Sequence, residues 1–391
     1  MRWFLQMNNE KILILTTVSG FLGKFEKENV RLLRDMGCEV HYAANPDTPV
    51  YPDGAAGFEK KGIIFHPAAI AKSPFAIVKN SRAYGQLKKI IKKEHINAIH
   101  CHTPVGGLLG RLLGRKYGLK VIYTAHGFHF YKGASALNNF IYGSIEKHLA
   151  KYTDALITIN EEDYRAACAF KLKEGGRVYK IPGVGLDTEK FSPASPEERE
   201  RERAALNIKE DEFFLVSVGE LNKNKNHETV VKAVSPMIKK DGLKIKYMVC
   251  GDGPYRARIE ETVTGLNLRE DIFLPGYYGK VRKILCAADA FVFPSVREGL
   301  GMAALEALSV GIPVIAADNR GSREYMEDGV NGFVCYKNSA EEYSENIKKV
   351  MALSKDRLAV MKSECIKTAG KFSKEKTAAV MEEIYRDCLE Q

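Results

Sequence analysis

The sequence predicts an α/β fold with two doubly wound domains, each built on a parallel sheet. A chain of 391 residues, 45% hydrophobic and 28% charged, is long enough for two globular domains. Short apolar segments alternate with helical patterns in both halves, as parallel sheets require. Residues 191–203, rich in proline, serine and charge, separate the halves and predict a linker that leads into an exposed helix.

Each predicted strand is a short apolar run between helical patterns. In the first half these runs are Lys11 to Thr17, Glu39 to Ala44, Asn97 to His102, Lys120 to Ala125 and Asp154 to Ile159. In the second half they are Phe213 to Val218, Tyr247 to Cys250, Ile272 to Leu274, Ala290 to Phe293 and Pro313 to Ala317. Loops at the carboxyl ends of such strands are the expected place for a ligand.

Composition predicts a cytoplasmic protein, or one peripheral on the inner face of the cell membrane. No apolar run reaches the roughly 18 residues that a membrane span needs. The start, Met1 to Gln6, leads into a strand without a cleavable signal pattern. The eight cysteines are scattered without a Cys-x-x-Cys pair, which argues against a disulfide framework and against a structural zinc site.

Basic residues are concentrated in the first half. Residues 1–190 hold 28 Lys and Arg against 17 Asp and Glu, whereas residues 191–391 hold 31 against 32. Lys79 to Lys93 interleaves apolar and basic positions at helical spacing. Two interpretations stay open: a face attracted to anionic lipid headgroups, or an ordinary solvated helix packed on its sheet. Nucleic acid is not an expected partner, because no recognition motif or aromatic cluster accompanies the charge.

A glycine-containing loop connects a predicted strand to a predicted helix in the second half. Ala290 to Pro294 is apolar, Met302 to Leu308 is a run of helix formers, and Gly299 and Gly301 lie between them. The first amides of a helix have no partner within the helix and attract anions. The amides of Leu300, Gly301 and Met302 are therefore predicted to hold a phosphate or diphosphate without a metal ion.

Two carboxylates flank this loop, Glu298 before the helix and Glu306 within it. Carboxylates accept hydrogen bonds from paired sugar hydroxyls, so both could face a polyhydroxylated ligand. A simpler interpretation makes Glu298 a charge at the helix start and Glu306 a solvated surface charge. The turn and strand that follow, Gly311 to Asp318, favour the ligand, because they place the pair at the carboxyl edge of a parallel sheet.

The segment from Glu298 to Ala307, preceded by Phe293-Pro-Ser, resembles the signature of the retaining family 4 glycosyltransferases. The resemblance covers nearly the whole chain and is closest to bacterial enzymes of capsular and exopolysaccharide synthesis. It implies the GT-B fold, in which two Rossmann-like domains face an interdomain cleft. The implied parts are an acceptor-binding domain at 1–190, a nucleotide-sugar-binding domain at 191–373 and a last helix at 374–391 that crosses back to the first domain.

The resemblance also implies roles for individual residues. Glu298 would hold the donor sugar's hydroxyls and Glu306 the ribose. Lys225 matches the lysine that contacts the donor diphosphate, and His126 matches the histidine that reaches the transferred sugar. Glu220 departs from the pattern, since the family usually has arginine there. Without the resemblance, Lys225 would read as a solvated loop charge and His126 as a half-buried residue at a strand end.

Three further positions are predicted to line the donor site. Gly219 follows the first strand of the second half, and the resemblance implies that Phe273 lies where the family's backbone reads the base. Gly20 follows the first strand of the chain, where it could approach a phosphate or serve only a tight turn. Cys250 to Pro254 is expected to be a tight glycine turn.

Neither a cofactor nor a metal is expected. The chain has no Asp-x-Asp pair, so a lysine and a helix start would neutralise the diphosphate. His126 with His129, and His100 with His102, could suggest a metal site, but no carboxylate or cysteine completes a recognisable ligand spacing.

The resemblance implies transfer of a sugar, with retention, from a uridine diphosphate donor to a saccharide on a polyprenyl diphosphate carrier. An anionic membrane surface would then be a partner of the first domain. Two alternatives stay open: a nucleotide-sugar epimerase of the same fold, and a non-catalytic partner subunit in which Glu220 has weakened donor binding.

Overall fold

The computed structural model describes residues 10–47, 57–58 and 62–390. The chain divides into two compact units, unit 1 (Met1–Gly185 with Lys374–Gln391) and unit 2 (Leu186–Ser373). The first change of unit thus comes slightly before the boundary placed at residue 190 from the sequence. Met1 to Gln6, on which the signal-peptide expectation rests, lies outside the described residues. No helix among the described residues is long and apolar enough to cross a membrane.

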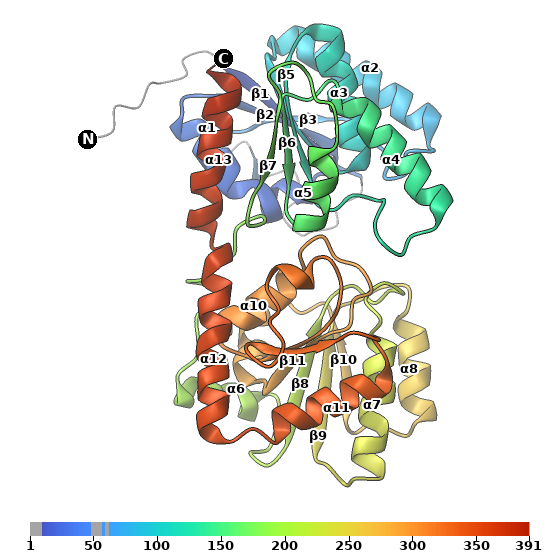
Figure 1. Cartoon of the computed structure of the whole chain (residues 1–391), viewed down its shortest axis with the longest axis vertical. Coiled ribbons are helices and arrows are strands. Elements are labelled where there is room, and N and C mark those ends of the chain that lie inside the picture. Colours follow the sequence, from blue (N-terminus) through green and yellow to red (C-terminus); the bar gives the residue numbers. More distant parts are fainter. Residues whose placement is uncertain (1–9, 48–56, 59–61, 391) are drawn as a thin grey trace, which may run out of the picture. The chain divides into compact units, whose positions relative to one another are not determined.

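Unit 1 is centred on a parallel sheet of seven strands in the order β3-β2-β1-β4-β5-β6-β7 (Figure 1). Two of them, the edge strands β3 and β7, were not predicted from the sequence. Both are short and only partly buried, so they lack the continuous apolar run that marks a central parallel strand. The strands are β1 (Lys11–Val18), β2 (Glu39–Asn45), β3 (Ile64–Pro67), β4 (Ala98–His102), β5 (Lys120–Ala125), β6 (Ala155–Thr158) and β7 (Arg177–Lys180).

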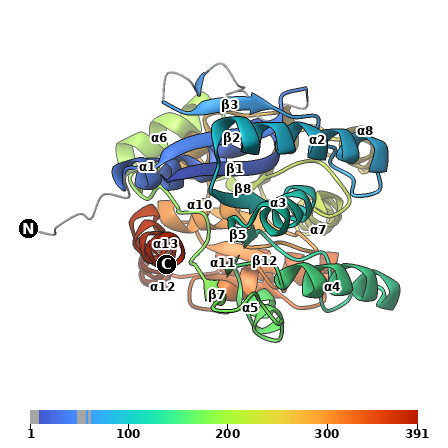
Figure 2. The same ribbon diagram turned by 90° about the horizontal axis from the view of Figure 1, so that it is seen from above.

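Helices cover both faces of this sheet (Figure 2). The apolar sides of α2 (Ile77–Glu94) and α3 (Pro104–Tyr117) enter one core, and α4 (Ala136–Ala150) packs against α3. On the other face α1 (Lys27–Asp35) contacts α13 (Lys374–Leu389). The Tyr385 hydroxyl bonds Nδ1 of His100 at 2.8 Å, which ties the last helix to the unit 1 sheet. The remaining helix, α5 (Glu161–Cys168), contacts β6 and β7.

The first helical segment of the chain begins earlier than the sequence suggests. Helical structure starts at Gly20 instead of near Lys24, and the turn η1 (Leu22–Glu26) is a π-helix. π-Helical turns are rare and often occur at functional sites.

A buried ion pair joins α3 to α4 in unit 1. Nη1 of Arg111 lies 2.7 Å from Oε2 of Glu146, and the guanidinium stacks over the ring of Tyr123 at 4.0 Å from its centroid. Both charged side chains are buried. Each therefore depends on the other for compensation of its charge.

Replacing Glu146 by leucine is expected to destabilise unit 1 by about 3–5 kcal/mol, because the buried guanidinium of Arg111 would lose its counter-charge. Urea denaturation followed by circular dichroism measures the change. Glu161→Gln is the control, because Glu161 pairs with Arg165 and Lys180 at the surface, and the variant should lose less than about 1 kcal/mol. Equal losses in the two variants would contradict the prediction.

Unit 2 contains a parallel sheet of six strands in the order β10-β9-β8-β11-β12-β13. All five predicted strands are present, and the partly buried edge strand β13 was missed. The strands are β8 (Phe213–Val218), β9 (Ile245–Cys250), β10 (Ile272–Gly276), β11 (Ala290–Phe293), β12 (Val314–Ala317) and β13 (Gly332–Cys335). The helices are α6 (Pro196–Ala205), α7 (His227–Lys239), α8 (Arg256–Gly265), α9 (Val281–Ala287), α10 (Met302–Val310), α11 (Ala340–Met351) and α12 (Lys355–Ala369).

The expectation of an exposed helix after residue 191 was wrong for the end of α6. Arg203 is buried there, and its Nη1 lies 3.0 Å from Oδ2 of Asp289, whose Oδ1 is 2.6 Å from Nη2 of Arg199. The dense charge of this segment therefore pairs within unit 2 and anchors the helix to it.

Candidate functional site

The chain order of the strands in unit 2 reverses at β8, which lies between β9 and β11. Ligands of open parallel sheets bind beside such a reversal, at the carboxyl ends of the strands. The loops after β8 and β11 are held together here. The amide of Val296 donates to the carbonyl oxygen of Asn224 at 2.8 Å, and Nδ2 of Asn224 donates to the carbonyl oxygen of Arg297 at 2.9 Å.

These two loops bring Lys225 and Glu298 into contact. Nζ of Lys225 donates to Oε1 of Glu298 at 2.6 Å and lies 5.4 Å from the ring centroid of Phe293. A Cβ on Gly219 would lie only 3.3 Å from Cδ of Lys225, so the glycine gives the lysine stem room to lie along the strand end. The sequence predicted both charged residues for the site, and the structure pairs them directly.

The helix α10 begins immediately after the loop that carries Glu298. Gly301 is its N-cap residue with φ of +96°, a conformation that glycine adopts without strain. A Cβ at this position would also meet the ring of Phe293 at 2.7 Å. The first amides of a helix have no partner within the helix, so the start of α10 is a position where an anion is favoured. Leu300, Gly301 and Met302 lie there as predicted, with Gly299 one residue earlier.

Two further residues predicted to bind the donor, Glu306 and Phe273, lie in α10 and β10. Glu306 is half-buried within α10, between the buried residues Leu305 and Ala307. Phe273 is half-buried in β10, the edge strand beyond β9, where it pairs in register with Met248.

The loop after β12, to which the sequence assigned no role, supports the loop that carries Glu298. Nδ2 of Asn319 donates to the carbonyl oxygen of Ser295 at 2.9 Å, and Nε of Arg320 donates to that of Glu298 at 3.3 Å. A Cβ on Gly321 would lie 2.8 Å from the carbonyl oxygen of Leu300. The Asn-Arg-Gly run after β12 was the available signal, but only the fold shows which loop it contacts.

The glycine turn after β9 is packed against the loop that follows β8. The amide of Gly219 donates to the carbonyl oxygen of Cys250 at 3.0 Å, and a Cβ on Gly251 would lie 1.8 Å from the carbonyl oxygen of Gly219. Glu220 is exposed and accepts a hydrogen bond from Nδ2 of Asn222 at 2.9 Å. Its carboxylate is therefore solvated at this loop.

In unit 1, His126 follows β5 beside another histidine. Its Nε2 lies 3.1 Å from Nδ1 of His102, which ends the neighbouring strand β4. Burial lowers the pKa of His126 to about 4, so its imidazole is neutral at pH 7 and suited to hydrogen bonding. Gly20 is buried at the start of the first helix, after β1.

A carboxylate that sequence spacing did not reveal joins these histidines. Oε1 of Glu26, in η1, lies 3.5 Å from Nδ1 of His102. Burial raises the pKa of Glu26 to about 8. The pairings considered from the sequence do not form this group. The ring of His129 lies 5.2 Å from that of Tyr142, and both nitrogens of His100 bond other residues, Tyr385 and Thr124.

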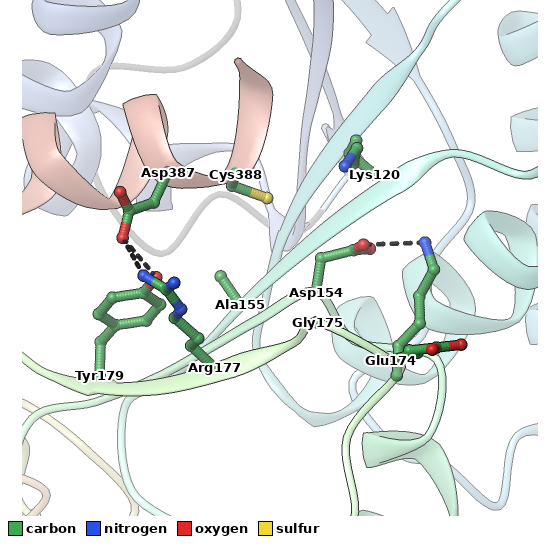
Figure 3. A pocket seen from close by; sticks show the side chains of 10 residues that line it. Lys120, Asp154, Ala155, Glu174, Gly175, Arg177, Tyr179, Asp387 and Cys388 are labelled. Atoms are coloured by element: carbon green, nitrogen blue, oxygen red, sulfur yellow. Dashed lines mark hydrogen bonds and ion pairs between the residues drawn. The ribbon is translucent and has the colours of Figure 1, made fainter. Parts of the chain in front are cut away.

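A pocket of about 120 Å³ lies elsewhere on unit 1 (Figure 3). It is at the amino ends of β5, β6 and β7, opposite to the ends that carry His102 and His126. Figure 3 shows Arg177 and Tyr179 paired with Asp387, and Asp154 is paired with Lys173 at 2.8 Å. Four of its charged side chains are paired in this way, and sites for drug-sized ligands are usually about 300 Å³ or larger.

Two family models match the chain, one in each half. Glycosyltransferase Family 4 matches residues 27–189, and Glycosyl transferases group 1 matches residues 198–366.

Curated relatives match over most of the chain. EpsD of Bacillus subtilis, whose name describes a glycosyltransferase, is 38% identical over 380 residues, with 96% of each chain covered. The UDP-Gal:alpha-D-GlcNAc-diphosphoundecaprenol alpha-1,3-galactosyltransferase of Escherichia coli is 28% identical, covering 80% of this chain and 81% of the relative.

Solved structures share the fold. Anabaena HepE in complex with UDP and glucose has a TM-score of 0.76 at 18% identity, covering 98% of this chain and all of HepE. Sucrose-phosphate synthase from Thermosynechococcus elongatus has a TM-score of 0.79 at 20% identity, covering 97% and 98%.

Proposed function

The chain belongs to the family 4 glycosyltransferases with a group 1 domain, and from this premise we propose a retaining transfer from a uridine diphosphate sugar to a lipid-linked saccharide. The observation that carries the proposal is the Lys225–Glu298 pair beside the start of α10. It sets one ammonium and one carboxylate beside the start of a helix, at the carboxyl end of adjacent strands. These are the groups that a sugar diphosphate needs.

The nucleotide and the diphosphate of the donor would be held by groups of unit 2. The amides at 300–302 and Nζ of Lys225 would neutralise the diphosphate as it leaves, without a metal ion. Glu298 would then exchange its lysine contact for the sugar's hydroxyls, and Glu306 would hold the ribose. In unit 1, the neutral imidazole of His126 would bond the transferred sugar. The acceptor would attack on the face that the diphosphate leaves, and a donor phosphate oxygen would take its proton.

Names of similar proteins support the choice of donor and acceptor. HepE was solved with UDP and with UDP-glucose. The Escherichia coli relative is named for a UDP-galactose donor and a diphosphoundecaprenol-linked acceptor. EpsD, whose name describes a glycosyltransferase, supports sugar transfer as the reaction. The fold alone supports none of these details, since one fold hosts many reactions.

A product analysis tests the proposal. Purified protein is incubated with a panel of UDP sugars, with and without GlcNAc-diphosphoundecaprenol, in buffer containing EDTA. Transfer that needs the acceptor and keeps the anomeric configuration supports it. Conversion of the donor without acceptor would identify an epimerase, and absence of UDP binding would identify a non-catalytic subunit.

We propose that unit 1 also docks on an anionic membrane, where a lipid-linked acceptor would lie. The apolar side of α2 is buried in the core, so the interleaved pattern of Lys79 to Lys93 is explained by packing on the sheet. The first turn of α2 and the residues just before it are different, because their apolar side chains are exposed. Phe75, Ile77 and Val78 are 73%, 75% and 85% exposed, beside the exposed residues Lys72, Lys79 and Arg82. Apolar side chains flanked by basic ones are typical of interfacial binding.

A second exposed apolar turn supports this surface. Leu137 and Phe140, in the first turns of α4, are 69% and 73% exposed. Both α2 and α4 lie on the right-hand side of unit 1 in Figures 1 and 2. Several large apolar side chains exposed on one side of one unit indicate an interaction surface rather than scattered exposure.

Replacing Phe75, Ile77 and Val78 by serine together is expected to weaken binding to phosphatidylglycerol vesicles by at least about 10-fold, because each apolar side chain gains roughly 1 kcal/mol or more on insertion. Vesicle co-sedimentation measures the loss. Val360→Ser is the control, since Val360 is 59% exposed on α12 of unit 2. Unchanged binding of the triple variant, or equal binding to purely zwitterionic vesicles, would refute this docking surface.

A further inference from the structure

Three side chains from separate elements of unit 1 converge on one point. Glu26 closes the π-helical turn η1, His102 ends β4, and His126 follows β5. One ligand atom from each, a carboxylate oxygen or a ring nitrogen, lies within 4.8 Å of the others. The π-helical turn brings the glutamate to the histidines, although 76 residues separate Glu26 from His102 in the chain.

The spacing of these atoms is compatible with one shared metal ion. Nδ1 of His102 lies 3.1 Å from Nε2 of His126 and 3.5 Å from Oε1 of Glu26. Tetrahedral zinc with bonds of about 2.0–2.1 Å separates its ligand atoms by about 3.3 Å. Nδ1 of His102 can form only one good hydrogen bond with these two neighbours, but both separations suit ligands that share one ion.

Among the described residues, no lysine or arginine compensates the carboxylate of Glu26. Glu26 and His102 are fully or almost fully buried, and Nδ2 of Asn29 donates to the second carboxylate oxygen at 2.7 Å. Nε2 of His102 also has no hydrogen-bond partner within the part of the chain that the structure describes. A buried carboxylate is costly unless it is protonated, paired or bound to a metal.

The wall around the group is apolar. The ring of Phe21 lies 5.5 Å from that of His102 and 5.1 Å from that of His126, and Phe25 lies 6.4 Å from His126. An apolar shell excludes water and strengthens the attraction between a cation and its ligands. The ammonium of Lys24 lies 5.3 Å from the ring centroid of Phe25.

We propose that Oε1 of Glu26, Nδ1 of His102 and Nε2 of His126 bind one divalent transition-metal ion, of which zinc fits best. Two imidazoles and one carboxylate suit zinc or cobalt and disfavour magnesium or calcium, which prefer oxygen ligands. Three protein ligands leave a fourth position open to water.

Occupation of this site would withdraw His126 from the sugar, so zinc is expected to inhibit transfer. This consequence rests on the proposed function, whereas the binding itself does not. The site belongs to unit 1 and is separate from the metal-independent binding of the diphosphate proposed for unit 2.

Titration of the full chain with Co²⁺, and its competition by Zn²⁺, tests the proposal. The protein is first freed of metal with EDTA, and Cys168, the exposed cysteine, is replaced by serine throughout so that its thiolate does not contribute. We expect one equivalent of Co²⁺ with the visible absorption of a four-coordinate ion. Glu26→Gln and His126→Gln should each weaken it at least 10-fold.

Glu28→Gln is the matched control. Glu28 lies two residues after Glu26 and forms a surface ion pair with Arg31, so the variant makes the same substitution outside the proposed site. His148→Gln controls for binding to an exposed imidazole. Full binding in Glu26→Gln, or no stoichiometric binding in the parent protein, would overturn the inference. UDP binding is measured in the same samples: UDP binding without metal binding contradicts this inference alone, and metal binding without UDP binding contradicts the proposed function alone.

Discussion

Replacing Lys225 by alanine is expected to lower kcat/KM for sugar transfer by about 10²–10³-fold, the usual cost of removing one group that stabilises charge in a transition state. The loss has two causes. The departing diphosphate loses an ammonium, and Glu298 loses the partner that lies 2.6 Å from its carboxylate. An unpaired carboxylate beside the diphosphate would repel it. Initial rates with the best UDP sugar of the panel, together with UDP affinity by calorimetry, measure both effects.

Lys223→Ala provides the matched control, because Lys223 lies in the same loop but is exposed. It should change either quantity by only a few fold, since exposed charges are screened by solvent. If Lys223→Ala were as damaging as Lys225→Ala, Lys223 would supply the positive charge that the family's arginine usually supplies at the position of Glu220. The Lys225–Glu298 contact would then be an ordinary loop ion pair.

The central strands of both sheets could be predicted because burial on two faces leaves a continuous apolar signal. β1 is buried along almost its whole length, and β8 is buried from Phe214 to Ser217. The edge strands β3, β7 and β13 could not be predicted in this way. Each is four residues long and only partly buried, so its sequence is indistinguishable from that of a loop. Pairing with a neighbour, a non-local interaction, decides their structure.

In the candidate site, too, features set by neighbouring residues in the chain could be predicted, whereas contacts between distant segments could not. Gly301 and the start of α10 were predictable, because a strand, two glycines and a helix follow one another in the chain. Lys225 was assigned by resemblance, and only the fold shows that it pairs with Glu298. Asn319, Arg320 and Glu26 were missed, because each acts on a segment far away in sequence.

The resemblance and the structure support the donor site through different kinds of evidence. The resemblance gives each residue a role but no geometry. The structure gives contacts, and these offer a reason why a carboxylate could stay beside the proposed anion site: the ammonium of Lys225 pairs with it, and a sugar's hydroxyls would replace that contact when the donor binds. Lys225 therefore has to serve two anions in turn, which makes the two residues energetically coupled.

Replacing Glu298 by glutamine should separate these roles. The amide keeps the side chain's shape but loses its charge, so its hydrogen bonds to the sugar weaken by about 1.5–3 kcal/mol, or roughly 10- to 100-fold in kcat/KM. UDP carries no sugar, and Lys225 would be released from its ion pair. UDP affinity is therefore expected to be unchanged or higher in Glu298→Gln, while transfer falls.

The double variant Lys225→Ala/Glu298→Gln completes the test. If the lone carboxylate repels the diphosphate in Lys225→Ala, its neutralisation should restore part of the UDP affinity while transfer stays low, and the two changes should not be additive. Calorimetry on the four proteins gives the coupling energy. Additive losses of UDP affinity would mean that the two side chains act independently, and a fall in UDP affinity in Glu298→Gln as large as the fall in transfer would place Glu298 on the nucleotide instead of the sugar.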